Sequence, residues 1–548
     1  MNSPQFFTTK TKSLYTQLVE GKFAVPKLQR AFVWNGRKAA MLLDSIYRGM
    51  PIGSLTIWDT SKRNKNLLRH TLHILPPFKD RNGRVWFVLD GQQRLSVLYR
   101  IFERGDPVNS GRDLLDFNRI VFRVTEGNEL ARFQYRKPVV GEWISVRSIL
   151  ASNWNSRLRE LTPGQLNRAA RCRQLLQSYQ VPIVKISTED LEEARELFIR
   201  INSLGTPLGA ADRAFARASR FDLRELANNT WQHLPPSFSG LRNEQFLQTR
   251  ALLDDVGDVG ERAFEAVAKK WDQRIAKDPL ALKQFTKLWD RQSKAIFRAI
   301  DYLRQNFYVL DDGLLPSENM VSTLAVFFYY HPALATPRQQ TEIKKWFWAT
   351  GIGQRYSGRG FRDNILRDAK FFQRLASGRG ARFRFEDRVD PIDLQRASYG
   401  RRSSIADALY CLLISQKPAY LANGATMLLQ EFASPANRKH KHHIFPRALL
   451  ARQKISLTRA NSIINLCFIC GEENSQFGSK KPFKYLDEFR RKRYFARVMR
   501  SHLLPFDHKS GLWDANVIRG YRYFLKARTR LLCRSFERAA GIKLFRNE

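Results

Sequence analysis

The sequence predicts an α+β, multidomain protein, and three observations lead to that prediction. The chain has 548 residues, of which 43% are hydrophobic, so it is long enough for two to four domains with sizeable cores. Strand-like and helix-like patterns alternate over residues 1 to about 215, which indicates a mixed α/β domain. Amphipathic helical patterns dominate residues 216–425, and a strongly basic region follows over residues 426–548.

Each element follows from its own pattern. In the first region, β-branched and aromatic runs predict strands at residues 53–58, 84–89, 119–124 and 181–186. Apolar residues at helical spacing predict helices there at residues 38–48, 93–103 and 189–201. In the second region, aromatic and aliphatic stripes predict the core of a helical bundle, with helices at residues 285–303, 320–330 and 341–348.

Two segments outside these elements are basic. Residues 356–362 are rich in glycine and arginine, which fits either a loop that contacts phosphate or an ordinary solvated linker. Residues 490–497 interleave basic and aromatic side chains, which fits either a surface that follows a nucleic-acid backbone or a charged helix face.

The charge of the chain indicates its partner. Lys and Arg total 93 against 51 Asp and Glu, which gives a formal net charge of +42 and a pI near 10.4. Such an excess favours a polyanion, because each neutralised phosphate releases counterions. No stretch approaches 18 uninterrupted apolar residues and the N-terminus lacks a signal-peptide core, so we expect a soluble, intracellular, nucleic-acid-binding protein without a membrane partner.

A predicted strand-to-helix junction carries Asp90-Gly91-Gln92-Gln93-Arg94. Gly91 allows a close backbone approach, the helix start offers N–H groups, and Arg94 can hold phosphate oxygens in a fork. The sequence therefore predicts a phosphate site here. The alternative is structural, with Asp90 capping the helix and Arg94 paired with a carboxylate.

Three further residues have two readings. Gln29 and Arg30 follow Pro26 on a predicted extended segment, where they can line the phosphate site or pack against Trp34. Asn202 can belong to the site or end the helix at residues 189–201, since Asn is common at helix ends.

In the basic C-terminal region, His442 and His443 precede Ile444-Phe445-Pro446, and Asn465 and Asn474 follow. Phosphodiester hydrolysis needs a cation near the phosphate and a base for water, and imidazole and amide groups can supply both. Neighbouring residues of a strand point to opposite faces, so the two His residues should have separate roles, one as a ligand and one as a base. The alternative is that this Lys- and His-rich run is only a solvated face.

The five Cys residues form an odd, scattered set, unlike a disulfide framework: Cys172, Cys411, Cys467, Cys470 and Cys533. Cys467 and Cys470 form a lone CxxC. Since no second CxxC exists, we favour apolar packing over a zinc or redox site.

The segment from His442 to Pro446, with Asn465-Leu466 and the stretch from Glu473 to Pro482, resembles the HNH (ββα-metal) nuclease domain of GmrSD-type modification-dependent (type IV) restriction enzymes. This resemblance implies that His442 and Asn474 bind a divalent metal, Mg²⁺ or Mn²⁺. It also implies that His443 is the general base and that Asn465 orients it.

The run from Asp90 to Arg94 is similar to the signature of the N-terminal domain of the same family, which has a ParB-like fold. Residues 25–34, 43–54 and 197–205 agree with it, so the resemblance covers most of the first 210 residues. It implies binding and hydrolysis of a nucleoside triphosphate, GTP or ATP, by one set of residues: Gln29, Arg30, Asp90, Gly91, Gln92, Gln93, Arg94 and Asn202.

Together these observations predict an N-terminal ParB-like sensor (1–215), a helical connector (216–425) and a C-terminal HNH nuclease (426–548). The predicted function is an NTP-regulated, metal-dependent endonuclease in the prokaryotic cytoplasm that cleaves modified phage DNA, alone, as a homo-oligomer or with defence-system partner proteins. Two alternatives stay open: a non-catalytic NTP-dependent DNA-binding switch, and an RNA or tRNA nuclease.

Overall fold

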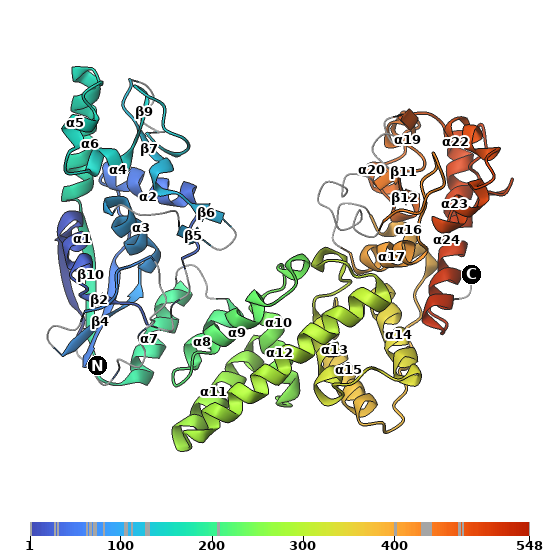
Figure 1. Cartoon of the computed structure of the whole chain (residues 1–548), viewed down its shortest axis with the longest axis horizontal. Coiled ribbons are helices and arrows are strands. Elements are labelled where there is room, and N and C mark those ends of the chain that lie inside the picture. Colours follow the sequence, from blue (N-terminus) through green and yellow to red (C-terminus); the bar gives the residue numbers. More distant parts are fainter. Residues whose placement is uncertain are drawn as a thin grey trace. The chain divides into compact units, whose positions relative to one another are not determined.

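A computed structural model gives the fold of the chain (Figure 1). It describes residues 3–26, 29, 32–61, 64, 68, 74–79, 83–103, 108–110, 113–126, 132–204, 209–398, 403–428, 441–469, 473 and 476–546. These residues form two compact units. The first comprises residues 1–223 with 268–278, and the second comprises residues 224–267 with 279–548. Helix α11 (Glu261–Lys277) contributes its C-terminal part to the first unit.

The first unit is built on a five-stranded mixed sheet with the strand order β1-β10-β3-β4-β2. β10 pairs with β3 in parallel and with β1 in antiparallel register, while β4 pairs antiparallel with β3 and parallel with β2. The strands are β1 (Gln5–Lys10), β2 (Phe23–Ala24), β3 (Leu55–Ser61), β4 (Arg84–Asp90) and β10 (Gln180–Ser187).

Helices and a smaller sheet complete this unit. The main core joins apolar residues of the sheet to α1 (Thr11–Val19), α2 (Gly36–Tyr47), α3 (Gln92–Phe102), α4 (Val146–Leu150) and α6 (Pro163–Ser178). A second cluster joins β3 and β4 to α7 (Leu191–Leu204) and α8 (Ala210–Arg217). The smaller sheet has the order β8-β7-β9 and consists of β7 (Ile120–Arg123), β8 (Phe133–Tyr135) and β9 (Trp143–Ser145). β5 (Val108–Ser110) and β6 (Asp113–Leu115) pair separately, and α5 (Trp154–Arg157) precedes α6.

The second unit begins as a helical assembly. α13 (Asn319–Tyr330) lies at its centre, with ten buried residues from Met320 to Tyr329. The helices of this part are α9 (Leu223–Gln232), α10 (Asn243–Leu253), α12 (Leu280–Phe307), α14 (Pro337–Ile352), α15 (Phe361–Ala376), α16 (Pro391–Arg396) and α17 (Ser404–Ser415).

The C-terminal part of the second unit contains one short antiparallel ladder, β11 (Lys441–His443) with β12 (Leu466–Phe468). Helices surround it: α19 (Arg447–Arg452), α20 (Leu457–Ala460), α22 (Pro482–Arg490), α23 (Phe495–Ser501) and the long α24 (Val517–Ala540).

The α+β, multidomain prediction is confirmed. All ten predicted elements are present, with ends displaced by a few residues: 53–58 is β3, 84–89 is β4, 119–124 is β7, 181–186 is β10, 38–48 is α2, 93–103 is α3, 189–201 is α7, 285–303 is α12, 320–330 is α13 and 341–348 is α14. None of the described helices is long and apolar enough to span a bilayer.

Candidate functional site

The Asp90 to Arg94 segment lies where β4 ends and α3 begins. Gly91 is the N-cap of α3 and has φ +87°, a backbone conformation that L side chains rarely adopt. The N-cap residue is thus Gly91 and not Asp90, and the Asp90 carboxylate accepts from Arg94 instead. The first N–H groups of a helix have no partner within the helix, and the first residues of α3 line the pocket described next.

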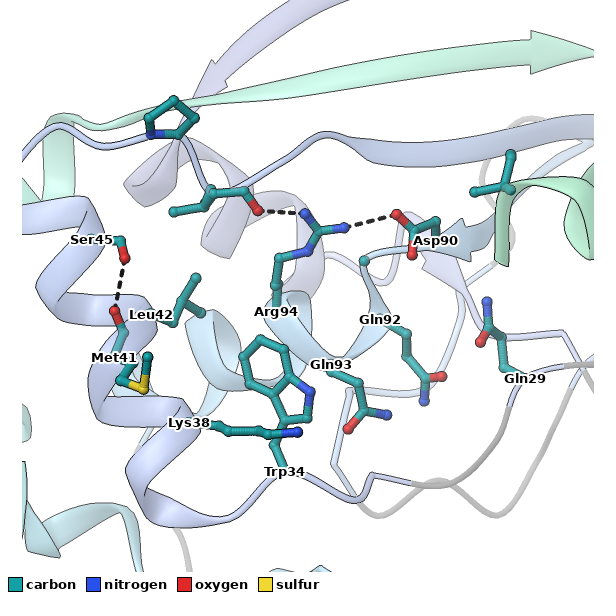
Figure 2. A pocket seen from close by; sticks show the side chains of 14 residues that line it. Gln29, Trp34, Lys38, Met41, Leu42, Ser45, Asp90, Gln92, Gln93 and Arg94 are labelled. Atoms are coloured by element: carbon teal, nitrogen blue, oxygen red, sulfur yellow. Dashed lines mark hydrogen bonds and ion pairs between the residues drawn. The ribbon is translucent and has the colours of Figure 1, made fainter. Parts of the chain in front are cut away.

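A pocket of about 510 Å³ opens at this junction (Figure 2). Its lining comes from α2, from the loop before β3, from the start of α3 and from α7: Gln29, Trp34, Lys38, Met41, Leu42, Ser45, Pro51, Ile52, Asp90, Gly91, Gln92, Gln93, Arg94 and Ile201. All of these residues belong to the first unit.

Arg94 is held by the protein itself. Its guanidinium donates to the carbonyl of Ile52, to the carbonyl of Ser54 at 3.0 Å and to Asp90 Oδ2 at 2.8 Å. The side chain is 15% exposed. The sequence predicted that Arg94 holds phosphate oxygens. In the structure its guanidinium joins the start of α3 to the loop before β3 and pairs with the Asp90 carboxylate.

The three glutamines that line the pocket differ in their contacts. Gln29 is buried and donates to the Val88 carbonyl at 3.0 Å, and Gln93 Oε1 accepts from Val33 N at 2.9 Å. Gln92 is 4% exposed, and its buried Oε1 accepts no hydrogen bond from any described residue. A buried amide oxygen without a donor is costly, so a ligand N–H or O–H in the pocket would relieve that cost.

Sequence reasoning did not identify two residues of the pocket as site residues. Lys38 and Trp34 lie together on the α2 side, opposite Gln92 (Figure 2). Asn35 caps α2 by accepting from Lys38 N at 3.0 Å, which sets the first turn and the position of Lys38. The capping residue in the sequence was the available signal.

Two predicted site residues are incompletely placed. Arg30 lies outside the described residues, and only the backbone of Asn202 is described, within the last turn of α7. Its neighbour Ile201 lines the pocket.

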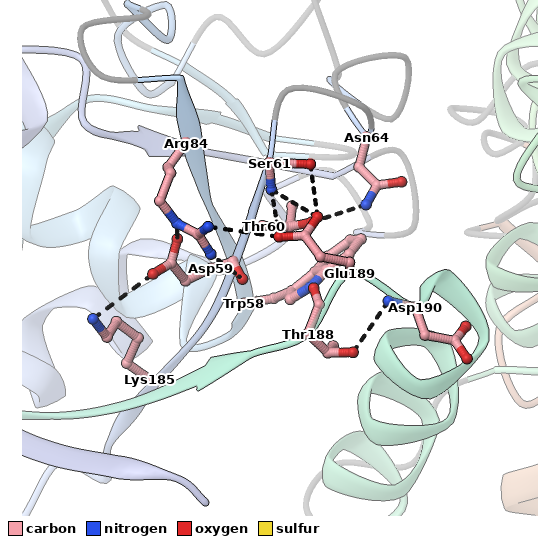
Figure 3. A network of polar contacts seen from close by, with 10 residues as sticks. All are labelled: Trp58, Asp59, Thr60, Ser61, Asn64, Arg84, Lys185, Thr188, Glu189 and Asp190. Carbon is pink, nitrogen blue, oxygen red and sulfur yellow. Dashed lines mark hydrogen bonds and ion pairs between the residues drawn. The ribbon is translucent and has the colours of Figure 1, made fainter. Parts of the chain in front are cut away.

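A separate polar network joins the ends of β3 and β10 (Figure 3). Glu189 accepts from Ser61 Oγ at 2.7 Å and from Thr60 Oγ1 at 3.0 Å, while Arg84 Nε donates to Asp59 Oδ1 at 2.7 Å. These hydrogen bonds lower the pKa of Glu189, chiefly through Ser61. Because its described polar groups bind one another, we interpret the network as a structural connection between β3 and the end of β10.

In the second unit, β11 places His442 and His443 on opposite faces, as the alternation of a strand requires. His443 lies opposite Leu466 of β12 and its Nε2 is 3.1 Å from Asn461 Oδ1. With that oxygen as acceptor, Nε2 carries the proton and Nδ1 is the basic nitrogen. Burial lowers the pKa of His443 to about 4, and Arg447 adds to this, so the ring is neutral near pH 7.

Asn465 holds the segment that carries His443. Its Oδ1 accepts from Phe445 N at 2.8 Å, and its Nδ2 donates to the carbonyls of Phe445 and Ala460 at 2.9 and 3.0 Å. The side chain is fully buried. The expected direct contact with the base is therefore made by Asn461, whereas Asn465 acts on the backbone two residues after His443.

The predicted metal ligands are only partly placed. His442 is 4% exposed, and its ring makes edge contacts with Phe477 and Tyr485 at centroid distances of 5.5 and 5.8 Å. Asn474 lies outside the described residues. In the described part of the chain, no group of three or more His, Cys, Asp or Glu side chains is arranged to share a metal ion. These residues alone do not make an open metal site.

The other sequence signals have structural roles where they are described. Cys467 is buried, which raises its pKa to about 12 and fits apolar packing, while Cys470 lies outside the described residues. Within 356–362, Tyr356 is buried and donates to Asp368 Oδ2 at 2.8 Å. Within 490–497, Phe495 is buried, and the exposed positions are basic: Arg490, Arg491, Lys492, Arg493 and Arg497.

Comparison with known proteins gives two matches. The chain is 23% identical over 538 residues to the uncharacterized protein MJ0686 of Methanocaldococcus jannaschii, an alignment that covers 88% of this chain and 87% of that protein. Residues 11–218 match the sequence model of the GmrSD restriction endonuclease N-terminal domain, a range that includes four of the five strands of the main sheet, all but β1, and the entire pocket lining. Residues 11–218 are therefore similar to the N-terminal domain of GmrSD-type restriction endonucleases.

Proposed function

We propose that this protein is an NTP-regulated, metal-dependent DNA endonuclease that senses modified phage DNA and cleaves it at an HNH site. The observation that carries the proposal is the contact of His443 with Asn461 beside the short β11–β12 ladder, in a chain whose N-terminal part matches the GmrSD N-terminal domain. Family membership of that domain supports a restriction role on DNA. The nucleotide, the metal and the modification are the proposed parts.

The N-terminal pocket supports a nucleotide. Lys38 supplies a cation, Trp34 supplies an aromatic face, and the start of α3 directs backbone N–H groups at the same volume. A helix N-terminus of this kind favours phosphate groups. Gln92 Oε1 then accepts from a donor on the nucleotide, and Arg94 keeps the loop before β3 in position.

The C-terminal frame supports a base for hydrolysis. β11 and β12 pair antiparallel, α22 follows, and the Asn465 clamp fixes the turn after His443. Nδ1 of His443 takes a proton from water as that water attacks phosphorus, and Asn461 stabilises the ring that becomes charged. The bond between phosphorus and the leaving oxygen breaks in the same displacement, and the ring then gives its proton to bulk water and returns to its neutral form.

The proposed metal ligands are His442 and Asn474. A divalent ion bound there neutralises charge on the phosphate and on the leaving oxygen. An imidazole nitrogen and an amide oxygen are both suitable donors, but His442 must turn away from Phe477 and Tyr485 to reach an ion. Calorimetric titration of the full chain with Mn²⁺ tests this directly, because His442→Ala should lose binding whereas His443→Ala should keep it.

The decisive experiment is a cleavage panel. Plain, methylated, glucosylated and phosphorothioated DNA are incubated with Mg²⁺ or Mn²⁺, with and without GTP and ATP, beside labelled RNA and tRNA. The proposal expects cleavage of one modified DNA that depends on metal and is changed by one nucleotide. Cleavage of RNA alone would favour the RNA nuclease alternative, and binding without cleavage in every condition would favour the non-catalytic switch.

A further inference from the structure

We propose that the outer face of α24 and the loop before it form a groove that binds an unpaired DNA strand. This inference deepens the proposed function, because it rests on DNA as the substrate, although it does not depend on cleavage. The groove has a volume of about 1020 Å³ and lies entirely in the second unit. α24 is the long C-terminal helix, drawn in red in Figure 1.

The groove is lined by a regular row of cations. Lys526, Arg530, Arg534 and Arg538 follow one another at four-residue spacing, so they share one face of α24, and all four are exposed. The row spans about 18 Å at 1.5 Å per residue. Arg500 and Lys509 add positive charge from the opposite wall, where Asp507 is the one carboxylate of the lining.

The floor of the groove is apolar. Leu503, Leu504 and Pro505 are buried, while Phe506 and Tyr523 stand at its sides, Tyr523 with 51% exposure. In a duplex the bases are stacked inside the helix, so their faces cannot reach the aromatic rings of such a surface. An unpaired strand also presents bases, which stack on aromatic rings while cations track the phosphates. The combination therefore favours a single strand.

The walls of the groove are held in place. Phe506 packs against Phe495 at 6.0 Å between ring centroids, with Arg500 over its ring, and its carbonyl accepts from Trp513 Nε1 at 3.0 Å. A second hollow of about 620 Å³ shares three of the lining residues, namely His508, Lys509 and Tyr523, and continues past Trp513 to Arg519. The path available to a strand is therefore longer than the row of cations alone.

The same helix supports the candidate cleavage segment with its inner face. Arg528 is fully buried and donates to the carbonyl of Leu503, which lines the groove, and to the carbonyl of His502. It also donates to the carbonyl of Leu466, which pairs with His443 in the β11–β12 ladder. Phe524 packs on Phe445 at 5.3 Å between centroids. A strand in the groove would thus lie on the element that positions the proposed base.

The test uses the full chain carrying His443→Ala, without metal, so that binding is measured apart from cleavage. One variant changes Lys526, Arg530, Arg534 and Arg538 to Gln. The matched control changes four exposed cations of α12 to Gln, namely Lys283, Lys287, Lys294 and Arg298. Both remove the same net charge. Fluorescence anisotropy then gives the affinity for single-stranded and duplex DNA between about 50 and 200 mM salt.

The groove variant should lose at least tenfold in single-strand affinity, and its slope of log affinity against log salt should fall by about 3, since each phosphate contact contributes about 0.7. The α12 control should stay within about twofold. Tyr523→Ala should weaken single-strand binding about tenfold, and Tyr523→Phe should restore it. Melting curves check that all variants fold.

Three results would overturn the groove as a site for an unpaired strand. The two quadruple variants could lose equal single-strand affinity, or the groove variant could lose affinity for duplex DNA only. Polyglutamate or anionic vesicles could also displace the strand at a lower concentration of negative charge than DNA does. Failure of the proposed function looks different. If the chain binds single-stranded DNA through the groove but cleaves no DNA, or if His443→Ala cleaves as fast as the original chain, the nuclease proposal fails and the groove stands; if the chain binds no DNA, both fail.

Discussion

At the scale of single residues, the contact between His443 Nε2 and Asn461 Oδ1 fixes both the tautomer and the direction of the ring. We predict that His443→Ala lowers single-turnover DNA cleavage about 10²-fold or more, since the base is lost. Asn461→Ala should lower it less, about tenfold, because the base remains but its orientation is weakened. His233→Ala, on an exposed histidine of the helical part, is the control and should change neither cleavage nor DNA affinity.

His502 gives a second prediction, on stability. Burial lowers its pKa from 6.5 to about 4, while its Nε2 contacts the Ala419 carbonyl at 2.8 Å. Between pH 6.5 and 4 the unfolded chain therefore binds more protons than the folded one, so the free energy of unfolding falls as the pH falls through this window. At about 1.4 kcal/mol per pKa unit, the loss is on the order of 3 kcal/mol.

Replacing His502 with Gln removes the titrating ring and keeps an N–H donor for Ala419. Melting temperatures at pH 7 and pH 5 should therefore differ less for His502→Gln than for the original chain. His443 also has a lowered pKa, but it is present in both proteins and cancels in the comparison. An identical pH dependence in the two proteins would exclude His502 as a source of acid instability.

The sequence predicted these residue contacts only in part, for a physical reason. It identified His443, but Asn461 and Asn465 are one helical turn apart, and only the folded turn decides which amide reaches the ring. It also identified Arg94, yet its partners include carbonyls about 40 residues earlier in the chain. Such long-range polar contacts leave no local pattern.

At the scale of elements, prediction succeeded because periodicity is local. Apolar alternation and helical spacing located β3, β4, α2 and α3 within a few residues. The order β1-β10-β3-β4-β2 was not predictable in this way, since it pairs strands that lie more than 100 residues apart. The pocket forms where this strand order brings the first turns of α2 and α3 together. Because the sequence does not reveal that arrangement, Lys38 was not predicted as a site residue.

The nucleotide pocket yields a prediction that separates binding from structure. Lys38→Met should weaken nucleotide binding at least tenfold, because Lys38 lines the pocket. The melting temperature should change little, because Lys38 forms no ion pair with the described residues. Arg94→Lys should lower the melting temperature, because a single ammonium cannot hold Ile52, Ser54 and Asp90 together. Calorimetry with GTP and ATP, beside thermal melting, checks both. A melting temperature lowered by Lys38→Met and not by Arg94→Lys would reverse the assignment.

An ion pair between Arg355, in the loop after α14, and Asp368 of α15 gives the next prediction. Asp368 binds Arg355 through two bonds of 2.9 and 2.8 Å and also accepts from Tyr356 and Trp346. Its side chain is 3% exposed. Asp368→Ala leaves Arg355 buried without its carboxylate, which should cost about 3–5 kcal/mol in the free energy of unfolding. Denaturant titration measures this, with Asp363→Ala on the exposed first turn of α15 as the control.

At the scale of the whole molecule, composition indicates the class of the partner but locates no site. A net charge of +42 indicates a polyanion regardless of fold, because electrostatic attraction acts before any specific contact. The charge does not say where the polyanion lies. In the described chain, cations line the pocket of the first unit, where we propose a nucleotide, and the α24 groove of the second, so the two proposed ligands occupy different units.

That separation allows a test of regulation through thermodynamic linkage. If nucleotide binding in the first unit changes DNA affinity by some factor, DNA must change nucleotide affinity by the same factor. We predict a factor between about 5 and 150, the usual range for coupled sites. The measurement uses His443→Ala without metal, with DNA affinity determined with and without saturating nucleotide, and nucleotide affinity determined with and without saturating DNA. Lys38→Met should bring both factors closer to one by the same proportion. The DNA affinity of this variant without nucleotide should equal that of the original chain. Factors of one in the original chain, with both ligands bound, would mean that the nucleotide does not regulate DNA binding, and any nucleotide effect on cleavage would then have to act on the catalytic step itself.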